Sequence, residues 1–369
     1  MQRQTKLNYH KNLPSVEPLV SIIIVNFNGG EMLMLCLKSV FDCKYKNIEV
    51  ILVDNGSTDG SITLAEELFG ERRNFKVVKL HKNIGFAQGN NLGVRYAIGK
   101  YIVFLNNDTV VDPWWLNELV KVMENDETIG AAQSKLLQLN NPKIFDSAGD
   151  FMDSYCLSFS RGHGEEDRGQ YDQIEEIFSA RGAAMIVRSN ALRRIGLFDS
   201  LLFGSCEDID LCWRLRLMGY RILYVPKSVV HHVVGATIKR LDATFTTFHQ
   251  TKNTLIISLK NKDLKELILH PSIIPTIGAM ILDIINRKNP KLFIARLRAI
   301  MWCLVKLREI CQRRLQTQNM KNQPTVNDAI LKSSLIAITR CFIYSFKFGS
   351  QGHKLYFSYL ITKHMKKWQ

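Results

Sequence analysis

Short apolar runs rich in β-branched residues alternate with helix-like patterns through the first hundred or so residues. The runs predicted to be buried strands are residues 20–25, 50–53, 76–80 and 101–105. The segments with apolar positions at helical spacing are residues 31–41, 61–69 and 88–98. This alternating order predicts an α/β fold with a mostly parallel central sheet and helices on both of its faces.

Polar, small or glycine residues follow each of these predicted strands. They occupy residues 26–30, 54–59, 83–87 and 106–108. Parallel α/β sheets bind their ligands at the carboxyl ends of the strands. We therefore expect the four segments to face one crevice.

The pattern continues to about residue 240. A helix is expected from Asp112, with Pro113 at its first position, and segment 140–172 is expected to be a long loop region that covers the site. Further strands are predicted at 129–135, 178–187 and 221–224, and further helices from 189 and over 208–219. The predicted organisation is an N-terminal tail (1–18), a main domain (19–240) and a basic helical C-terminal region (241–369).

The net charge of +15 resides entirely in the last third of the chain. Residues 238–369 contain 23 basic and 6 acidic residues, whereas residues 1–237 contain 26 and 28. The longest charge-free run there, 267–282, has 16 residues, which is fewer than the roughly 18–20 needed to span a bilayer. Residues 291–315, with Trp302, have the basic amphipathic pattern of a helix on an anionic membrane surface. A helical bundle packed on the main domain with a solvated basic face is the alternative.

Eight cysteines without a Cys-x-x-Cys pair indicate neither a zinc ribbon nor a disulfide scaffold. Residues 1–19 lack the apolar core of a secretory signal. We interpret the cysteines as free thiols in a reducing compartment. The predicted location is the cytoplasm, peripheral on the inner face of the cell membrane.

Asp54 directly follows a predicted strand, so its carboxylate is expected to point into the crevice. There it could accept the imide N–H of a uracil or thymine ring. Helix capping is the alternative for Asp54 and the favoured interpretation for Asp59. The dinucleotide-binding glycine fingerprint does not follow the first strand.

A second carboxylate, Asp108, ends the segment Asn106-Asn107-Asp108 after another buried strand. Mg²⁺ or Mn²⁺ could bridge this carboxylate to a diphosphate, because both ions take one or two carboxylates plus phosphate oxygens. A simple turn aspartate is the alternative. His231 and His232 follow a later strand, and a neutral imidazole is a plausible additional Mn²⁺ ligand.

Three carboxylates, Glu207, Asp208 and Asp210, open a predicted helix. Their mutual repulsion raises a pKa, while the positive end of the helix opposes that rise. A base tuned in this way could remove a proton from a sugar hydroxyl. Stabilisation of the helix dipole alone would explain one or two of the three acids.

Taken together, residues 18–240 resemble the family 2 glycosyltransferases of the GT-A fold, in particular rhamnosyltransferase-like members. The segments that carry the resemblance are VSIIIVNFNGG (20–30), VDNGSTDGS (53–61), NIGFAQGNNLG (83–93), FLNNDT (104–109), RGHGEEDRGQYD (161–172), ARGAAMIVRSNALRRIGLFD (180–199), EDIDLCWRLRLMGYRI (207–222) and HVVGAT (232–237). The resemblance implies a GT-A nucleotide-diphospho-sugar transferase fold followed by the basic helical region.

The resemblance also implies roles for individual residues. It implies that Asp208 is the general base and that Asp108 and His232 hold the metal ion. Asn106 occupies the first position of the family's Asp-x-Asp motif, which leaves Asp108 as its only carboxylate. The residues implied to bind donor or acceptor are Asn28, Asp54, Asn83, Gly85, Phe86, Asn106, Gly182, Ala183, Glu207, Asp210 and Trp213.

The implied reaction is inverting, Mg²⁺- or Mn²⁺-dependent transfer of a hexose or deoxyhexose, possibly rhamnose, from a UDP- or dTDP-sugar. The expected acceptor is a glycan or a lipid-linked hydroxyl in cell-surface polysaccharide synthesis. A sugar nucleotidyltransferase is the alternative enzyme. A nucleic-acid-binding protein is disfavoured, because the basic residues are interleaved with long apolar runs and the chain lacks the stacking-aromatic pattern of an RNA-binding sheet.

Overall fold

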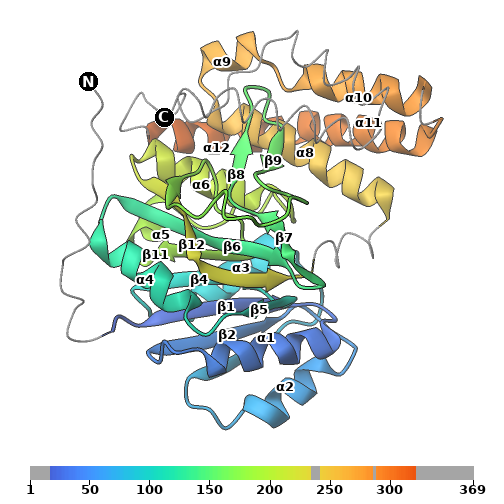
Figure 1. Cartoon of the computed structure of the whole chain (residues 1–369). Coiled ribbons are helices and arrows are strands. Elements are labelled where there is room, and N and C mark those ends of the chain that lie inside the picture. The colour runs from blue at the N-terminus through green and yellow to red at the C-terminus, as the bar shows by residue number, and fades with distance from the viewer. Residues whose placement is uncertain (1–16, 234–241, 286–287, 321–369) are drawn as a thin grey trace, which may run out of the picture.

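The computed structural model describes residues 17–233, 242–285 and 288–320. A ten-stranded sheet runs through its centre, with the path β10-β12-β6-β11-β4-β1-β2-β3; β5 pairs with β12 and β7 with β6 (Figure 1). The strands are β1 (Val20–Asn26), β2 (Ile48–Asp54), β3 (Phe75–Lys79), β4 (Tyr101–Asn106), β5 (Thr109–Val111), β6 (Ile129–Gln138), β7 (Asn141–Ser147), β10 (Glu175–Glu176), β11 (Ala184–Arg188) and β12 (Arg221–His232).

The sheet is mostly parallel, as predicted. Strands β4, β1, β2 and β3 run in one direction, and β12 runs parallel to β6. Strand β11 is antiparallel to both of its neighbours, β4 and β6. Since β11 is antiparallel to both β4 and β6, these two strands and their parallel partners run in the same direction. The carboxyl ends of β1, β2, β4, β6 and β12 therefore lie along the same edge.

Helices cover both faces of the sheet, because successive strand residues point to opposite sides. Ile22 and Ile24 pack with one layer, formed by α1 (Gly30–Asp42), α2 (Ser61–Phe69) and α4 (Trp115–Asn125). Ile23 packs with the other layer, formed by α3 (Phe86–Val94), α5 (Ser189–Ile195) and α6 (Glu207–Leu217). Strands buried on both faces explain the uninterrupted apolar runs in the sequence.

The segment predicted as a long loop, 140–172, contains three strands. Strand β7 pairs with β6, while β8 (Asp150–Met152) and β9 (Ser158–Ser160) form a separate two-stranded sheet. The three strands of segment 140–172 are short and carry Asp, Ser and Asn, so hydrophobic alternation does not reveal them. The last strand was also predicted too short, since β12 continues to His232 and so carries the histidine pair.

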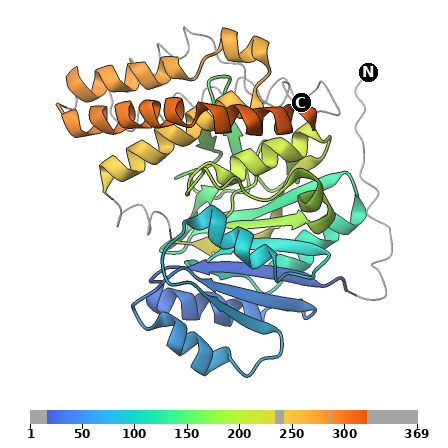
Figure 2. The ribbon, with the colours of Figure 1, turned by 180° about the vertical axis from the view of Figure 1, so that it is seen from behind.

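Five helices form a layer beyond α6, at the top of Figure 1 and, from behind, in Figure 2. They are α8 (Ala243–Asn261), α9 (Leu264–Leu269), α10 (Ile273–Ile285), α11 (Pro290–Val305) and α12 (Leu307–Asn319). Trp213 and Leu217 of α6 pack with Ile256 of α8, Cys303 of α11 and Ile310 of α12. The predicted helical C-terminal region is therefore present over the described residues up to 320, where it is packed on the main domain, and residues 321–369 lie outside the described residues. The predicted boundary at residue 240 and the N-terminal tail up to residue 16 lie outside the described residues.

The stretch Leu264–Ile285 has 22 residues and a mean hydropathy of 1.7, so by length and composition alone it could cross a membrane. The sequence prediction excluded it because that prediction required a run free of charge. Residues 270–272 divide the stretch into α9 and α10. The seven described cysteines are free thiols, as predicted, and Cys341 lies outside the described residues.

Arg188 ties the centre of the sheet to α4. Its guanidinium donates to the carbonyls of Ile129 (3.0 Å), Asp126 (3.0 Å) and Met123, and to the hydroxyl of Tyr101 (3.1 Å). We predict that Arg188→Met lowers the free energy of unfolding by about 3 kcal/mol, because several buried acceptors lose their donor. Urea denaturation measures this loss. Arg193→Met, at an exposed position of α5, is the control and should change stability by less than about 0.5 kcal/mol.

Candidate functional site

Hydrogen bonds join the carboxyl ends of three neighbouring strands, β4, β1 and β2. Asn107 donates to the side chain of Asn26 (2.6 Å), which donates to the hydroxyl of Ser57 (3.1 Å). The backbone N–H of Ser57 in turn donates to Asp54 (3.0 Å). Asp54 is buried at the end of β2. The structure thus brings the polar segments after β1, β2 and β4 together, as the sequence predicted.

The turn after β1 is locked against the turn after β2. The Asn28 backbone N–H donates to the Ser57 hydroxyl (3.0 Å), and the Asn28 side chain accepts from the N–H of Thr58 (2.8 Å). Asn28 has a φ of 53°, a left-handed conformation that asparagine tolerates better than most residues. Asp59 accepts from Gly30 (2.8 Å) and Ser61 (3.1 Å), at the starts of α1 and α2.

The segment 83–86 is held by Asn55, a residue that sequence analysis did not select. Asn55 donates to the Asn83 side chain (3.0 Å) and accepts from the N–H of Ile84 (2.9 Å), while Asn83 accepts from the N–H of Gly85 (2.8 Å). Phe86 donates its N–H to the carbonyl of Phe203 (2.9 Å). The position of Asn55, directly after Asp54 in a strand-end motif, was the available signal.

Gly182 connects this segment to α6. A Cβ at Gly182 would lie 3.4 Å from the Phe86 ring and 3.8 Å from the Asp208 Cβ. The Gly182 N–H donates to the Asp208 carboxylate (3.0 Å). The neighbouring Ala183 carbonyl accepts from the N–H of Asn106 at the end of β4 (3.1 Å). Phe86, the backbone of 182–183 and Asp208 therefore form one wall.

His232, at the end of β12, lies between two carboxylates. Its Nε2 is 3.2 Å from Asp108 Oδ1 and 3.3 Å from the Asn106 amide nitrogen, and its Nδ1 is 2.8 Å from Asp146 Oδ2. Burial alone would lower the pKa of His232, but its bonds to Asp108 and Asp146 raise the pKa to about 9. The other histidine, His231, instead contacts Asp112 (3.1 Å). The structure thus places His232, and not His231, beside Asp108.

Asp146 and Arg181 were missed by sequence analysis, although they link the two halves of the site. Arg181 donates to Asp146 (3.1 Å) and to both oxygens of Asp150 (3.0 and 3.1 Å). Burial would raise the pKa of Asp146, but the Arg181 charge and hydrogen bonds from His163 and His232 hold it well below its usual range. Asp146 lies in β7, within the segment predicted as a loop. Its partners come from distant segments, so the sequence contains no spacing signal for it.

A chain of neighbouring contacts connects Asp108 to Asp208. Asp108 contacts His232, His232 contacts Asp146, and Asp146 pairs with Arg181, whose neighbour Gly182 binds Asp208. The predicted site residues other than Glu207, Asp210 and Trp213 are therefore linked into one cluster by these contacts and by the hydrogen bonds described above.

The three acids at the start of α6 differ in their surroundings. Burial and the charge of Asp208 raise the pKa of Glu207 to about 8, and Glu207 Oε2 accepts no hydrogen bond within the described residues. Burial and the charge of Asp150 raise the pKa of Asp208, against the N–H groups of Gly182 and Ile209 and the Arg181 charge. Glu207 and Asp208 are therefore both poised to hold a proton nearer neutral pH than ordinary carboxyls.

Asp210 and Trp213 do not line the crevice, in contrast to the prediction. Asp210 is fully buried and paired with Lys260 (2.6 Å) and Arg214 (3.0 Å). Burial would raise the pKa of Asp210, but these two cations lower it to about 2. Trp213 is 2% exposed and packs edge-on against Phe178. Both side chains point toward the C-terminal helices, whose packing the sequence pattern did not reveal.

Comparison with known proteins found similar sequences and similar folds. The family model "Glycosyl transferase family 2" matches residues 21–195. Poly-beta-1,6-N-acetyl-D-glucosamine synthases of Staphylococcus epidermidis and Staphylococcus aureus (strain COL) are 26% and 25% identical over 219 residues. Each match covers 59% of this chain and 51% of the relative, so the chain spans about half the length of these relatives.

Two solved structures share the fold. GalNAc-T7 with UDP, GalNAc and Mn²⁺ has 18% identity and a TM-score of 0.52, covering 68% of this chain and 53% of that one. The mannosyltransferase PcManGT from Pyrobaculum calidifontis, in complex with GDP-Man and Mn²⁺, has 16% identity and a TM-score of 0.50, covering 83% and 87%. The fold is the GT-A fold. Residues 21–195 are similar to the glycosyl transferase family 2 model, and the implied rhamnosyltransferase-like subtype stays a prediction.

The close approach of Phe203 requires glycine at position 85. Gly85 has a φ of +89°, and an added Cβ would lie 2.5 Å from the Phe203 carbonyl oxygen and 2.7 Å from its ring. We predict that Gly85→Ala costs at least about 2 kcal/mol more than Gly60→Ala, because overpacking adds to the backbone strain. Gly60 is the matched control, with a φ of +78° and open space around it, and strain alone should cost about 1–2 kcal/mol there. Chemical denaturation of the two variants gives the comparison, and equal losses would contradict the described crevice.

Proposed function

We propose that the protein transfers a sugar from a nucleoside diphosphate carrier to a hydroxyl of a glycan or lipid-linked acceptor. The observation that carries the proposal is the contiguous cluster joining Asp108, His232 and Asp208 at the carboxyl edge of a family 2 domain. Asp208 itself follows the matched segment 21–195, so its role rests on the geometry of the cluster.

The donor would enter along the segments after β2 and β3. Asp54, at the end of β2, would accept the imide N–H of a uracil or thymine base, and Asn28, Asn83, Gly85 and Phe86 would form the nucleotide pocket. Because the curated relatives are named poly-N-acetylglucosamine synthases, we favour UDP-N-acetylhexosamine over a rhamnose donor. Gly182 and Ala183 would lie beside the donor sugar, with backbone close enough to exclude water.

Asp108 and His232 fit a divalent cation that is also held by a diphosphate. Asp108 Oδ1 and His232 Nε2 lie 3.2 Å apart, so both side chains could hold one ion together with the phosphate oxygens of the donor. Asp108 Oδ1 accepts no other hydrogen bond within the described residues, which leaves it available as a ligand. Among those residues no group of three or more His, Cys, Asp or Glu could hold a metal ion, so substrate phosphate would complete the site. Mg²⁺ or Mn²⁺ would neutralise charge on the departing diphosphate.

Asp208 would act as the general base. Its raised pKa suits proton abstraction near neutral pH, and the Gly182 N–H fixes one carboxylate oxygen. Asp208 would take the proton from the acceptor hydroxyl as that oxygen attacks the anomeric carbon from the side opposite the leaving diphosphate. A single displacement of this kind inverts the anomeric configuration. Glu207, buried and without a partner for Oε2, would bind an acceptor or donor hydroxyl.

We predict that Asp208→Asn lowers turnover by about 10²- to 10⁴-fold, because the amide cannot accept the proton. Donor affinity, measured by calorimetry, should change by less than roughly threefold, since the amide still occupies the position. Transfer is followed with UDP-N-acetylglucosamine and other sugar nucleotides in the presence of Mn²⁺ or Mg²⁺. Turnover within about tenfold of the wild type would show that Asp208 is not the base. Release of pyrophosphate from a nucleoside triphosphate would instead support the nucleotidyltransferase alternative.

We further propose that the C-terminal helices dock on an anionic membrane surface from the cytoplasmic side, where lipid-linked acceptors would reside. Helices α9–α11 expose many large apolar side chains, among them Leu264, Ile268, Ile277, Ile281, Ile284, Ile285, Ile294, Leu297, Met301 and Leu304. Beneath them lies an apolar cavity of about 260 Å³ lined by residues of α8–α11. Exposed apolar helices within a region of net charge +17 fit an anionic interface better than free solvent.

We predict that the triple variant Ile277→Ser, Ile281→Ser, Ile284→Ser reduces co-flotation with phosphatidylserine-containing liposomes at least about fivefold, because three apolar contacts with the bilayer are lost. Leu64→Ser, Leu68→Ser on α2 is the matched control, with two exposed leucines removed from the opposite end of the molecule (Figure 1). Failure of the wild type to float would reject docking. Resistance of the bound protein to carbonate extraction would show that α9–α10 spans the bilayer.

A further inference from the structure

Helix α8 holds the segment that leads into α6. Asn253 donates to the carbonyls of Gly204 (2.9 Å) and Ser205 (2.7 Å), and Lys252 donates to the carbonyl of Leu201 (2.8 Å). Ser205 and Cys206 have φ values of 75° and 67°, which are strained for residues other than glycine. Contacts from outside help to keep such residues in place, and Asn253 supplies two of them, to Gly204 and to the strained Ser205, two residues before Glu207.

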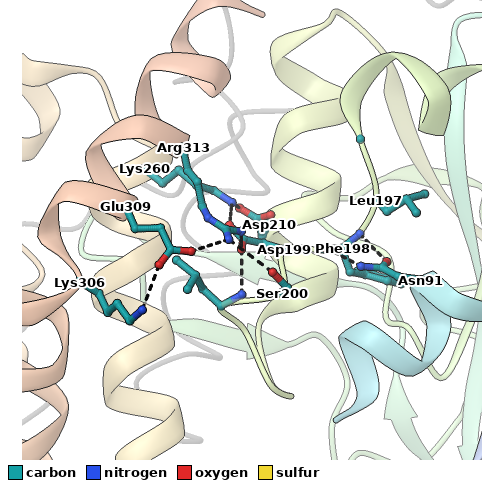
Figure 3. A network of polar contacts seen from close by, with 12 residues as sticks. Asn91, Leu197, Phe198, Asp199, Ser200, Asp210, Lys260, Lys306, Glu309 and Arg313 are labelled. Carbon is teal, nitrogen blue, oxygen red and sulfur yellow. Dashed lines mark hydrogen bonds and ion pairs between the residues drawn. The ribbon is translucent and has the colours of Figure 1, made fainter. Parts of the chain in front are cut away.

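A buried ion network also holds α6 just after Asp208, at Asp210. Lys260 of α8 lies 2.6 Å from Asp210 and 2.6 Å from Asp199, and all three side chains are at most 4% exposed (Figure 3). Asn261 also donates to Asp210 (2.9 Å), and Arg313 of α12 pairs with Asp199. Lys260 thereby compensates two buried carboxylates, one of them on the same helix turn as Asp208.

Asp208 has no side-chain partner of its own in the described structure that would fix it to the sheet. Its carboxylate accepts only from the backbone N–H groups of Gly182 (3.0 Å) and Ile209 (2.8 Å). Its position is therefore set by where the first turn of α6 lies. Displacement of a reacting group by about 1 Å can cost about 10²-fold in rate.

We propose that Asn253 and Lys260 are positioning residues for Asp208, so that α8 is a working part of the transfer site. The proposal rests on the proposed function. Residues 243–261 lie outside the segment that matches the family model, so the match itself assigns α8 no role. The C-terminal helices would then serve catalysis as well as membrane docking.

The test compares full-length Asn253→Ala and Lys260→Met with the wild type. Each should lower kcat by about 10- to 100-fold while the donor KM and the calorimetric donor affinity change less than about twofold. The acid limb of the pH–kcat profile should move upward in Lys260→Met, because Asp210 loses one of its two compensating cations and keeps only Arg214. The other charged groups facing Asp208 are Glu207 on α6, Asp150 at the start of β8 and Arg181 before β11. Asn253→Ala removes no charge and should leave that limb in place.

Arg296→Gln is the control for general loss of stability. Arg296 pairs with buried Asp283 (2.8 Å) and donates to Thr251 (3.1 Å), so it joins α11, α10 and α8 without touching α6. It should lower Tm comparably but keep kcat within about twofold. Wild-type kcat in both test variants, or equal kcat losses in Arg296→Gln, would overturn the positioning role.

A double variant tests whether Lys260 acts by positioning α6 or only by compensating the charge of Asp210. In Lys260→Met, Asp210→Asn, stability should recover in part because α6 no longer buries the carboxylate that lost Lys260, while kcat should stay low because the tether is still missing. Recovery of kcat together with Tm would reduce the role of Lys260 to stability. An inactive wild type would instead reject the proposed function, and with it this inference, whereas an active wild type with unaffected variants rejects the inference alone.

Discussion

The candidate site depends on the ion pairs that Arg181 makes with Asp146 and Asp150. Arg181 compensates Asp146 and Asp150, which come from β7 and β8, and Asp146 in turn orients His232 at the end of β12. The next residue along the chain, Gly182, holds Asp208 through its backbone. Without this cation, two partly or fully buried carboxylates would repel each other between the proposed metal ligands and the proposed base.

Neighbouring acids at the start of α6 have pKa values shifted in opposite directions because their surroundings differ. Burial and few compensating charges raise the pKa values of Asp208 and Glu207. Asp210, two residues further on, faces α8 and is fully ionised by Lys260 and Arg214. The helix thus carries two carboxyls of raised pKa and, facing α8, an ionised carboxylate that anchors it to the C-terminal layer.

That layer has two unlike surfaces. Its inner side packs on Trp213 and Leu217 and carries the buried ion pairs, while α9–α11 turn apolar side chains outward. The sequence suggested either a membrane-facing basic helix or a bundle packed on the domain. The structure contains the packed bundle, and the exposed apolar positions keep the membrane surface as a proposal.

The sequence by itself determined the order of the parallel strands and the polar segments at their carboxyl ends, because buried strands must be apolar and ligand-binding turns must be polar or glycine-rich. It also selected Asp54, Asp108, Asp208 and His232, which the structure brings to one edge. Only the tertiary structure decided that Asp146 and Arg181 belong to the site and that Asp210 and Trp213 do not. Long-range pairs such as Arg181 with Asp146 or Lys260 with Asp210 form between segments whose spacing along the chain carries no periodic signal.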